Sequence, residues 1–259
     1  MSDWQPLYGP LAAARLGDGE RVAFCHGFTQ TSSSWKPLAA QVALLGYECV
    51  VVDLPGHGGS ANVRADLRMT ADLLTATVGT ASYVGYSLGG RLCLTTALAY
   101  PDRVRRLAMI GANPGIVDDA ERARRLDGDG ALAAQILRDG VPAFLEGWMS
   151  QPLFGGGPPD PTDLAERSNN TADGLAGSLR LAGTGAQVPM WGRLRQLGMP
   201  TLVMAGERDT KFTAIGRQMA SMIPEATFAS IAEADHAAHL QHPAAVLALL
   251  RAWLQIKRL

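Results

Sequence analysis

The stretch Ser82-Tyr83-Val84-Gly85-Tyr86-Ser87-Leu88-Gly89-Gly90-Arg91 decides the fold. It begins with residues typical of a buried strand and continues into a segment with a helical pattern that runs to Tyr100. Between the two, Gly85 to Gly89 match the pattern G-x-S-x-G, which places a serine on a sharp strand-to-helix turn. Glycines on both sides of Ser87 avoid side-chain clashes there. The sequence therefore predicts a serine hydroxyl that stands clear of a sheet, above a helix N-terminus that favours negative charge.

Around this turn, short apolar runs alternate with helical patterns along the chain. The expected strands are 22–25, 49–53, 82–84, 107–110, 202–205 and 227–231. The expected helices are 35–45, 65–78, 88–100, 213–222 and 244–254. This alternation predicts the α/β class, with a mostly parallel sheet and helices on both faces.

The alternation stops between residues 114 and 197, where helical segments are separated by glycine and proline clusters. We expect residues 1–113 and 198–259 to form one α/β core and residues 114–197 to form a helical cap inserted between two of its strands. A separate domain is the alternative, but the stretch is short and the strand pattern resumes after it.

Composition excludes several classes of protein. The 259 residues are 47% hydrophobic and carry a net charge of −1, so the chain can bury a large core and has no basic field for nucleic acid. The first residues lack the pattern of a signal peptide, and no apolar run approaches the roughly 20 residues that cross a bilayer. We expect a cytoplasmic, soluble protein without membrane insertion, either a monomer or a weak homo-oligomer. The three cysteines lie in apolar segments, which indicates buried free thiols.

A serine hydroxyl needs a base to react at neutral pH. His26 and His57 follow the first two expected strands in tight loops and are expected to be structural. His236, His239 and His242 follow the last expected strand. The first loop after that strand reaches the serine best, so we expect His236 to be the base.

An acid should hold the imidazole in the right tautomer. Asp209 follows the strand 202–205 and gives the chain order serine, acid, histidine. Glu207 and Asp235 compete with it, but a residue adjacent to His236 in sequence usually points away from it. We expect Asp209 in this role and no metal.

Developing negative charge also needs donors that are placed in advance. The backbone N–H of Leu88 is one by its position after Ser87. The backbone N–H of Phe28, which follows His26-Gly27, is the natural second. The sequence thus predicts an oxyanion hole made by two main-chain groups.

Further segments carry a family resemblance that spans about residues 23 to 243. They are Cys25-His26-Gly27-Phe28-Thr29 with Trp35, Asp53-Leu54-Pro55-Gly56-His57-Gly58, Gly85 to Arg91, Pro114-Gly115, Phe144-Leu145-Glu146-Gly147-Trp148, Gln151-Pro152-Leu153-Phe154, Arg167-Ser168-Asn169-Asn170, Gly183-Thr184-Gly185, Trp191 and Gly206-Glu207-Arg208-Asp209-Thr210-Lys211-Phe212. Together they resemble the 2-succinyl-6-hydroxy-2,4-cyclohexadiene-1-carboxylate (SHCHC) synthases of menaquinone biosynthesis, which have the α/β-hydrolase fold.

This resemblance implies a lyase that uses no cofactor. The family eliminates pyruvate from 2-succinyl-5-enolpyruvyl-6-hydroxy-3-cyclohexene-1-carboxylate to give SHCHC. By resemblance, Ser87 activated by His236 would abstract a ring proton, and no acyl-enzyme is needed. A serine hydrolase acting on a small ester and a non-catalytic receptor of small molecules are the alternatives.

The implied substrate carries several carboxylates, so cationic side chains should line the pocket. Arg91 lies at i+4 from Ser87, on the same helix face. Arg167 lies in a matched cap segment, and Arg125 is chosen over Arg124 where the match is ambiguous. Tyr86 and Trp148 are expected to contact the substrate as well.

Two residues depart from the family pattern. Asp235 stands where a small residue is expected before the catalytic histidine, and Gln241 stands where the family often has an acid. Neither change removes a reacting group, but together they leave room for a shifted substrate.

Overall fold

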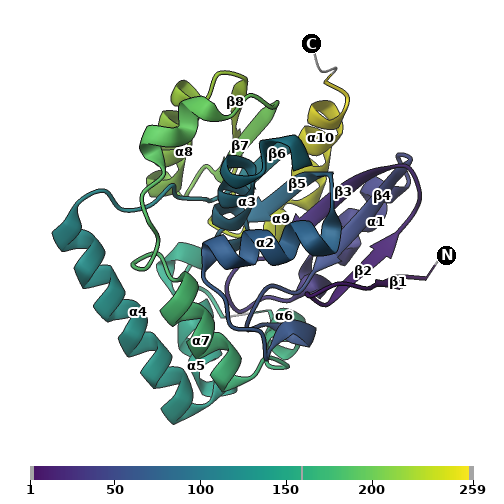
Figure 1. The fold of residues 1–259 in the computed structure, drawn as a ribbon. Helices are drawn as coiled ribbons and strands as arrows, with labels where there is room; N and C mark the ends of the chain where they lie inside the picture. The colour runs from purple at the N-terminus through teal and green to yellow at the C-terminus, as the bar shows by residue number, and fades with distance from the viewer. Residues whose placement is uncertain (1–2, 159, 257–259) are drawn as a thin grey trace.

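The computed structural model describes residues 3–158 and 160–256 (Figure 1). Its centre is a sheet with the strand order β1-β2-β4-β3-β5-β6-β7-β8. Strand β2 is antiparallel to both of its neighbours, whereas all other neighbouring strands are parallel. The strands are β1 Gln5–Leu7, β2 Ala13–Leu16, β3 Glu20–Cys25, β4 Tyr47–Val52, β5 Ala81–Tyr86, β6 Val104–Ile110, β7 Thr201–Gly206 and β8 Ala226–Ile231.

The six strands expected from the sequence correspond to β3 through β8, so the predicted α/β class is confirmed. The sequence did not predict β1 and β2. Both are short and contain no fully buried residue; β1 is mostly exposed and β2 is mostly half-buried. A strand that buries neither face has no apolar alternation to reveal it.

Helices cover both faces of the sheet because side chains alternate along each strand. In β4, Cys49 and Val51 pack on the face covered by α1 and α10, while Val50 and Val52 pack on the face covered by α2, α3 and α8. Burying one such valine stabilises the fold by about 1.5–3 kcal/mol. The helices of the two faces are α1 Lys36–Ala43, α2 Leu67–Val78, α3 Leu88–Ala99, α8 Thr210–Met222, α9 Ala238–Gln241 and α10 Pro243–Leu254. All three cysteines are buried and free.

Between β6 and β7 the chain leaves the sheet, and its described residues form four α-helices, which lie together at one end of the molecule (Figure 1). They are α4 Asp119–Asp139, α5 Val141–Met149, α6 Pro161–Arg167 and α7 Ala172–Ala182. Ile136, Leu145 and Leu175 belong to a small core of their own, whereas Met190 and Leu194 pack into the main core. We propose that this excursion from the sheet, residues 114–197, acts as a cap. No helix among the described residues is long and apolar enough to cross a membrane.

The carboxyl ends of the parallel strands lie at the same edge of the sheet, and this edge faces the helices between β6 and β7. In an open α/β sheet, ligands bind outside the carboxyl ends of the strands. The loops after β3, β5, β7 and β8 carry Phe28, Ser87, Asp209 and His236 respectively. The topology therefore brings together four residues that are far apart in the sequence.

Candidate active site

Ser87 lies on the turn between β5 and α3, with φ of 51° and ψ of −108°. This left-handed conformation costs a residue with a Cβ atom about 1–3 kcal/mol, so its surroundings must hold it. The backbone N–H of Ser87 donates to the carbonyl of Ile110 at 2.8 Å. A Cβ atom at Gly85 would lie 2.3 Å from the carbonyl oxygen of Gly89, and one at Gly89 would lie 2.1 Å from that of Cys25. Close backbone packing therefore requires both glycines.

The imidazole of His236 lies between Ser87 and Asp209. Its Nε2 is 3.2 Å from Ser87 Oγ, and its Nδ1 is 2.6 Å from Asp209 Oδ2. Both His236 and Asp209 are buried. Asp209 is also the N-cap of α8, where its Oδ1 accepts the N–H of Phe212 at 3.3 Å. In this arrangement His236 Nδ1–H donates to the carboxylate, and Nε2 can accept a proton from the serine.

The competing acids point elsewhere. Glu207 Oε2 accepts the backbone N–H of Glu233 at 3.1 Å, which supports a residue with φ of 59° in the loop before His236. Asp235 forms two hydrogen bonds with Gln241: its N–H donates to Oε1 at 2.7 Å, and its Oδ2 accepts from Nε2 at 3.1 Å. Asp235 and Gln241 are therefore partners of each other.

The backbone N–H groups of Phe28 and Leu88 belong to residues that border the same cavity as Ser87. Leu88 is the first residue of α3, where helical N–H groups have no partner within the helix. Neither N–H donates to any acceptor in the part of the chain that the structure describes. Both are thus available to an oxygen of a bound molecule.

The cavity above Ser87 has a volume of about 720 Å³ and lies between the strand ends and the cap helices. Cationic side chains line it together with a group of aromatic rings. The cations are Arg91, Arg124, Arg125 and Lys211, and the aromatic residues are Phe28, Tyr86, Phe144, Trp148, Phe154 and Phe212. A site of this composition suits a ligand that is anionic in one part and apolar in another.

Two of the expected arginines are held by neighbouring side chains. Arg91 is buried, and its Nη1 donates to Gln187 Oε1 at 3.0 Å. Burial lowers the pKa of Arg91 to about 10, which leaves it charged at neutral pH. The Nε of Arg125 donates to Asp129 Oδ1 at 2.8 Å, and the side chain of Arg125 remains 43% exposed.

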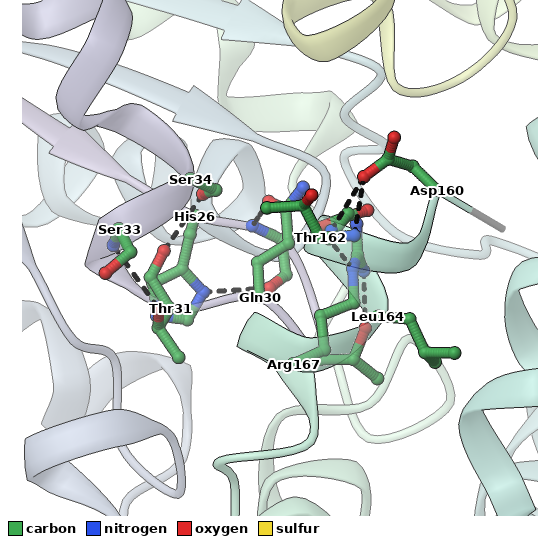
Figure 2. A network of polar contacts seen from close by, with 12 residues as sticks. His26, Gln30, Thr31, Ser33, Ser34, Asp160, Thr162, Leu164 and Arg167 are labelled. Carbon is green, nitrogen blue, oxygen red and sulfur yellow. Dashed lines mark hydrogen bonds and ion pairs between the residues drawn. The ribbon is translucent and has the colours of Figure 1, made fainter. Parts of the chain in front are cut away.

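Arg167, expected to contact substrate, is not among the residues that line the cavity. It is buried, and its Nε donates to Asp163 Oδ1 at 2.9 Å while its Nη1 donates to Thr29 Oγ1 at 2.6 Å. Figure 2 shows this neighbourhood, with His26 and Gln30 on one side and Arg167 on the other. The guanidinium is committed to the loop after β3, which explains why it does not line the cavity.

Tyr86 and Trp148 both line the cavity, as expected of substrate contacts. The ring of Tyr86 lies against those of His236 and His239, with centroids 5.3 Å and 4.3 Å away. Burial raises the pKa of the Tyr86 hydroxyl. Trp148 stacks on Phe144 with centroids 5.7 Å apart, and its buried indole N–H has no partner among the described residues.

Sequence reasoning missed Lys211 and ranked Arg124 behind Arg125, although both line the cavity. Lys211 is exposed and lies two residues after Asp209, in the first turn of α8. Its position two residues after Asp209, at the start of a helix, could have indicated that Lys211 lies near the site. Gln187, which holds Arg91, gave no sequence signal because it lies in a loop with no helical or strand pattern.

The two histidines expected to be structural support the loops around the site. His26 Nε2 accepts the N–H of Leu54 at 3.0 Å, and His57 Nε2 accepts the N–H of Thr29 at 3.3 Å. Each ring also donates from Nδ1 to a main-chain carbonyl. Burial lowers the pKa of both imidazoles, that of His57 to about 3. Within residues 3–158 and 160–256, no group of three or more His, Cys, Asp or Glu side chains is arranged to hold a metal ion.

Comparisons with known proteins show which family the chain belongs to. A family model of the alpha/beta hydrolase fold matches residues 20–243. The 2-succinyl-6-hydroxy-2,4-cyclohexadiene-1-carboxylate synthase of Salmonella heidelberg (strain SL476) is 32% identical over 234 residues, which are 87% of this chain and 90% of that protein. The synthase of the same name from Enterobacter sp. (strain 638) is 32% identical over 249 residues, with 91% and 92% coverage.

Solved structures show the same relationship. The structure of MenH from S. aureus superimposes with a TM-score of 0.89 and 26% identity, covering 94% of this chain and 97% of that one. A thermophilic esterase from Thermogutta terrifontis has a TM-score of 0.80 at 23% identity and 98% coverage of both chains, which shows the shared fold alone. The chain belongs to the alpha/beta hydrolase fold family and, within it, to the 2-succinyl-6-hydroxy-2,4-cyclohexadiene-1-carboxylate synthases.

Proposed function

We propose that this protein is a carbon–oxygen lyase that eliminates pyruvate from 2-succinyl-5-enolpyruvyl-6-hydroxy-3-cyclohexene-1-carboxylate to give SHCHC, without a cofactor. The observation that carries the proposal is that one cavity holds Ser87, His236 and a set of cationic side chains. The names of the family members supply the specific reaction. In this proposal Ser87, His236 and Asp209 are the catalytic triad.

The reaction follows from comparing substrate and product. The ring loses the proton at carbon 2, which is acidic because it lies next to the succinyl ketone. The ring double bond moves, a second one forms, and the bond from ring carbon 5 to the enolpyruvyl oxygen breaks. The departing enolate takes up a proton and becomes pyruvate.

The triad can move both protons. The Ser87 hydroxyl gives its proton to His236 Nε2, 3.2 Å away, as the serine oxygen takes the ring proton. Asp209 stabilises the imidazolium that forms. His236 then returns its proton to the leaving enolate. The serine and the imidazole end in their starting states, so no covalent intermediate is required.

The remaining groups stabilise charge. Negative charge that develops on the succinyl ketone oxygen would be bound by the N–H groups of Phe28 and Leu88. The substrate also carries a ring carboxylate, a succinyl carboxylate and an enolpyruvyl carboxylate. Arg91 and Arg125 can bind carboxylates in pairs of hydrogen bonds, and Arg124 and Lys211 add positive charge to the same cavity.

The direct test measures pyruvate release from the enolpyruvyl substrate with a coupled dehydrogenase. Ser87→Ala is expected to lower kcat by about 10³-fold or more, because the proton relay is lost while binding is kept. Ser168→Ala is the matched control, since among residues 3–158 and 160–256 that hydroxyl donates only to the Leu164 carbonyl. The lyase assignment is wrong if the wild type releases no pyruvate or if Ser87→Ala releases it at the wild-type rate. Turnover of activated esters without pyruvate release would favour a hydrolase instead.

A further inference from the structure

The cap holds the loop that carries one of the two oxyanion donors. Residue Thr29 follows Phe28 directly and has φ of 68°, a left-handed conformation that β-branched residues rarely adopt. Such a conformation persists only where the surroundings over-determine it. Thr29 is completely buried, so its contacts must supply that restraint.

Three polar groups of Thr29 each have a partner. Its N–H donates to His57 Nε2 at 3.3 Å, its carbonyl accepts from Asn170 Nδ2 at 2.7 Å, and its Oγ1 accepts from Arg167 Nη1 at 2.6 Å. Two of the three partners come from the cap, at the end of α6 and just after it. The strained residue is therefore restrained from both the core and the cap.

Both the nitrogen and the oxygen of the Asn170 amide form hydrogen bonds. Besides the Thr29 carbonyl, its Nδ2 donates to the carbonyl of Arg167 at 3.0 Å, and its Oδ1 accepts the N–H of Gly58 at 2.9 Å. Asn170 is 6% exposed and Arg167 is 4% exposed, and neither lines the cavity. Their placement serves the loops after β3 and β4 and not a ligand.

We propose that Asn170 and Arg167 are positioning residues, which clamp Thr29 so that the Phe28 N–H points at the developing oxyanion. The clamp makes the oxyanion hole depend on the cap being seated on the core. The proposal rests on the assignment of Ser87 and the Phe28 N–H as reacting groups. It does not depend on which compound is the substrate.

The test compares Asn170→Ala with Asn169→Ala. Asn169 is the neighbouring, exposed asparagine, and its side chain makes no hydrogen bond within the described residues. The rate of Ser87 labelling by a 4-nitrophenyl phosphonate is measured per active site, because the phosphonyl oxygen occupies the oxyanion donors. A merely structural role would reduce the fraction of labelled sites but not the rate constant of the sites that remain.

Asn170→Ala is expected to lower the labelling rate constant by about 10- to 100-fold, less than the loss of a whole oxyanion donor. The kcat for pyruvate release should fall by a similar factor, while KM changes less than about threefold. Asn169→Ala should leave all three quantities within twofold. The clamp is wrong if Asn170→Ala keeps the wild-type rate constant, or if the wild type is not labelled. Labelling of the wild type without pyruvate release would overturn the lyase assignment. The comparison of the labelling rate constants of Asn170→Ala and Asn169→Ala would still test the clamp.

A second pair of variants covers the case in which Asn170→Ala does not fold. Thr29→Val removes the Oγ1 that accepts from Arg167 and keeps the β-branched shape, whereas Thr29→Ser keeps the hydroxyl. The valine variant is expected to be labelled at least fivefold more slowly than the serine variant. Equal rates for the two would contradict the role of Arg167.

Discussion

At the scale of single residues, Asp235 and Gln241 act together as a hydrogen-bonded pair. The N–H of Asp235 donates to Gln241 Oε1, and the amide of Gln241 donates to the Asp235 carboxylate at 3.1 Å. An acid at position 241 could not donate this bond and would repel Asp235. The glutamine is therefore the side chain that suits an aspartate before His236.

This pairing predicts a coupling between the two positions. Gln241→Glu is expected to lower the free energy of unfolding by about 0.5–1 kcal/mol, because two carboxylates would meet at a largely exposed site. Adding Asp235→Ser should remove most of that loss, since only one charge then remains. Urea unfolding of the wild type, both single variants and the double variant gives the coupling energy. Additive effects of the two substitutions would show that the residues do not interact.

At the scale of elements, α4 is fastened to the turn after α7 through one buried carboxylate. Asp129 Oδ2 accepts the N–H of Gly185 at 3.0 Å, and its Oδ1 accepts from Arg125. A Cβ atom at Gly183 would lie 2.5 Å from this carboxylate, so the turn fits closely around it. The Asp129 carboxylate, which joins α4 to the turn after α7, therefore also orients Arg125, one of the cations that line the cavity.

Asp129→Ala is accordingly expected to have two effects. The free energy of unfolding should fall by about 2–3 kcal/mol, because a buried N–H loses its acceptor and a charge pair is broken. The KM for the enolpyruvyl substrate should rise roughly tenfold as Arg125 loses its support. Asp127→Ala, an exposed position on the same helix, is the control and should change stability by less than about 0.5 kcal/mol. An Asp129→Ala enzyme with unchanged KM would separate Arg125 from substrate binding.

At the scale of the whole molecule, neutral histidines beneath the site make stability depend on pH. Burial lowers the pKa of His57 from its ordinary value of 6.5 to about 3, and it lowers that of His239 in the same direction. The unfolded chain takes up a proton at each histidine near pH 6.5, whereas folded His57 resists protonation down to about pH 3. The unfolded state therefore binds more protons in this window, and stability falls as the pH falls.

Each such histidine should contribute a slope of up to about 1.4 kcal/mol per pH unit to the free energy of unfolding below pH 6.5. His57→Gln is expected to flatten this dependence, because glutamine does not titrate and can still accept the Thr29 N–H. Urea unfolding at several pH values between 4 and 7 measures both slopes. Parallel curves for the wild type and His57→Gln would mean that His57 does not set the acid sensitivity.

Much of the fold follows from short-range pattern. The strands β3 to β8 were predicted because they are short apolar runs; β5 and β7 are buried at every position. The helices that cover the sheet were predicted from their helical pattern. The turn at Ser87 was predicted from the G-x-S-x-G pattern. The structure gives the reason for the glycines: a Cβ atom at position 85 or 89 would lie 2.3 Å or 2.1 Å from a main-chain oxygen. Strands β1 and β2 were not predicted because they are short and contain no fully buried residue.

The sequence by itself determined the strand-to-helix turn at Ser87 and the α/β alternation, because these depend on neighbours within a few residues. Only the tertiary structure decided that Asp209, 27 residues before His236, hydrogen-bonds to it while Glu207 and Asp235 turn to other partners. Only the tertiary structure turned Arg167 toward Thr29 instead of the cavity. The direction of a long side chain depends on partners from distant elements, and packing of those elements fixes what local sequence leaves open.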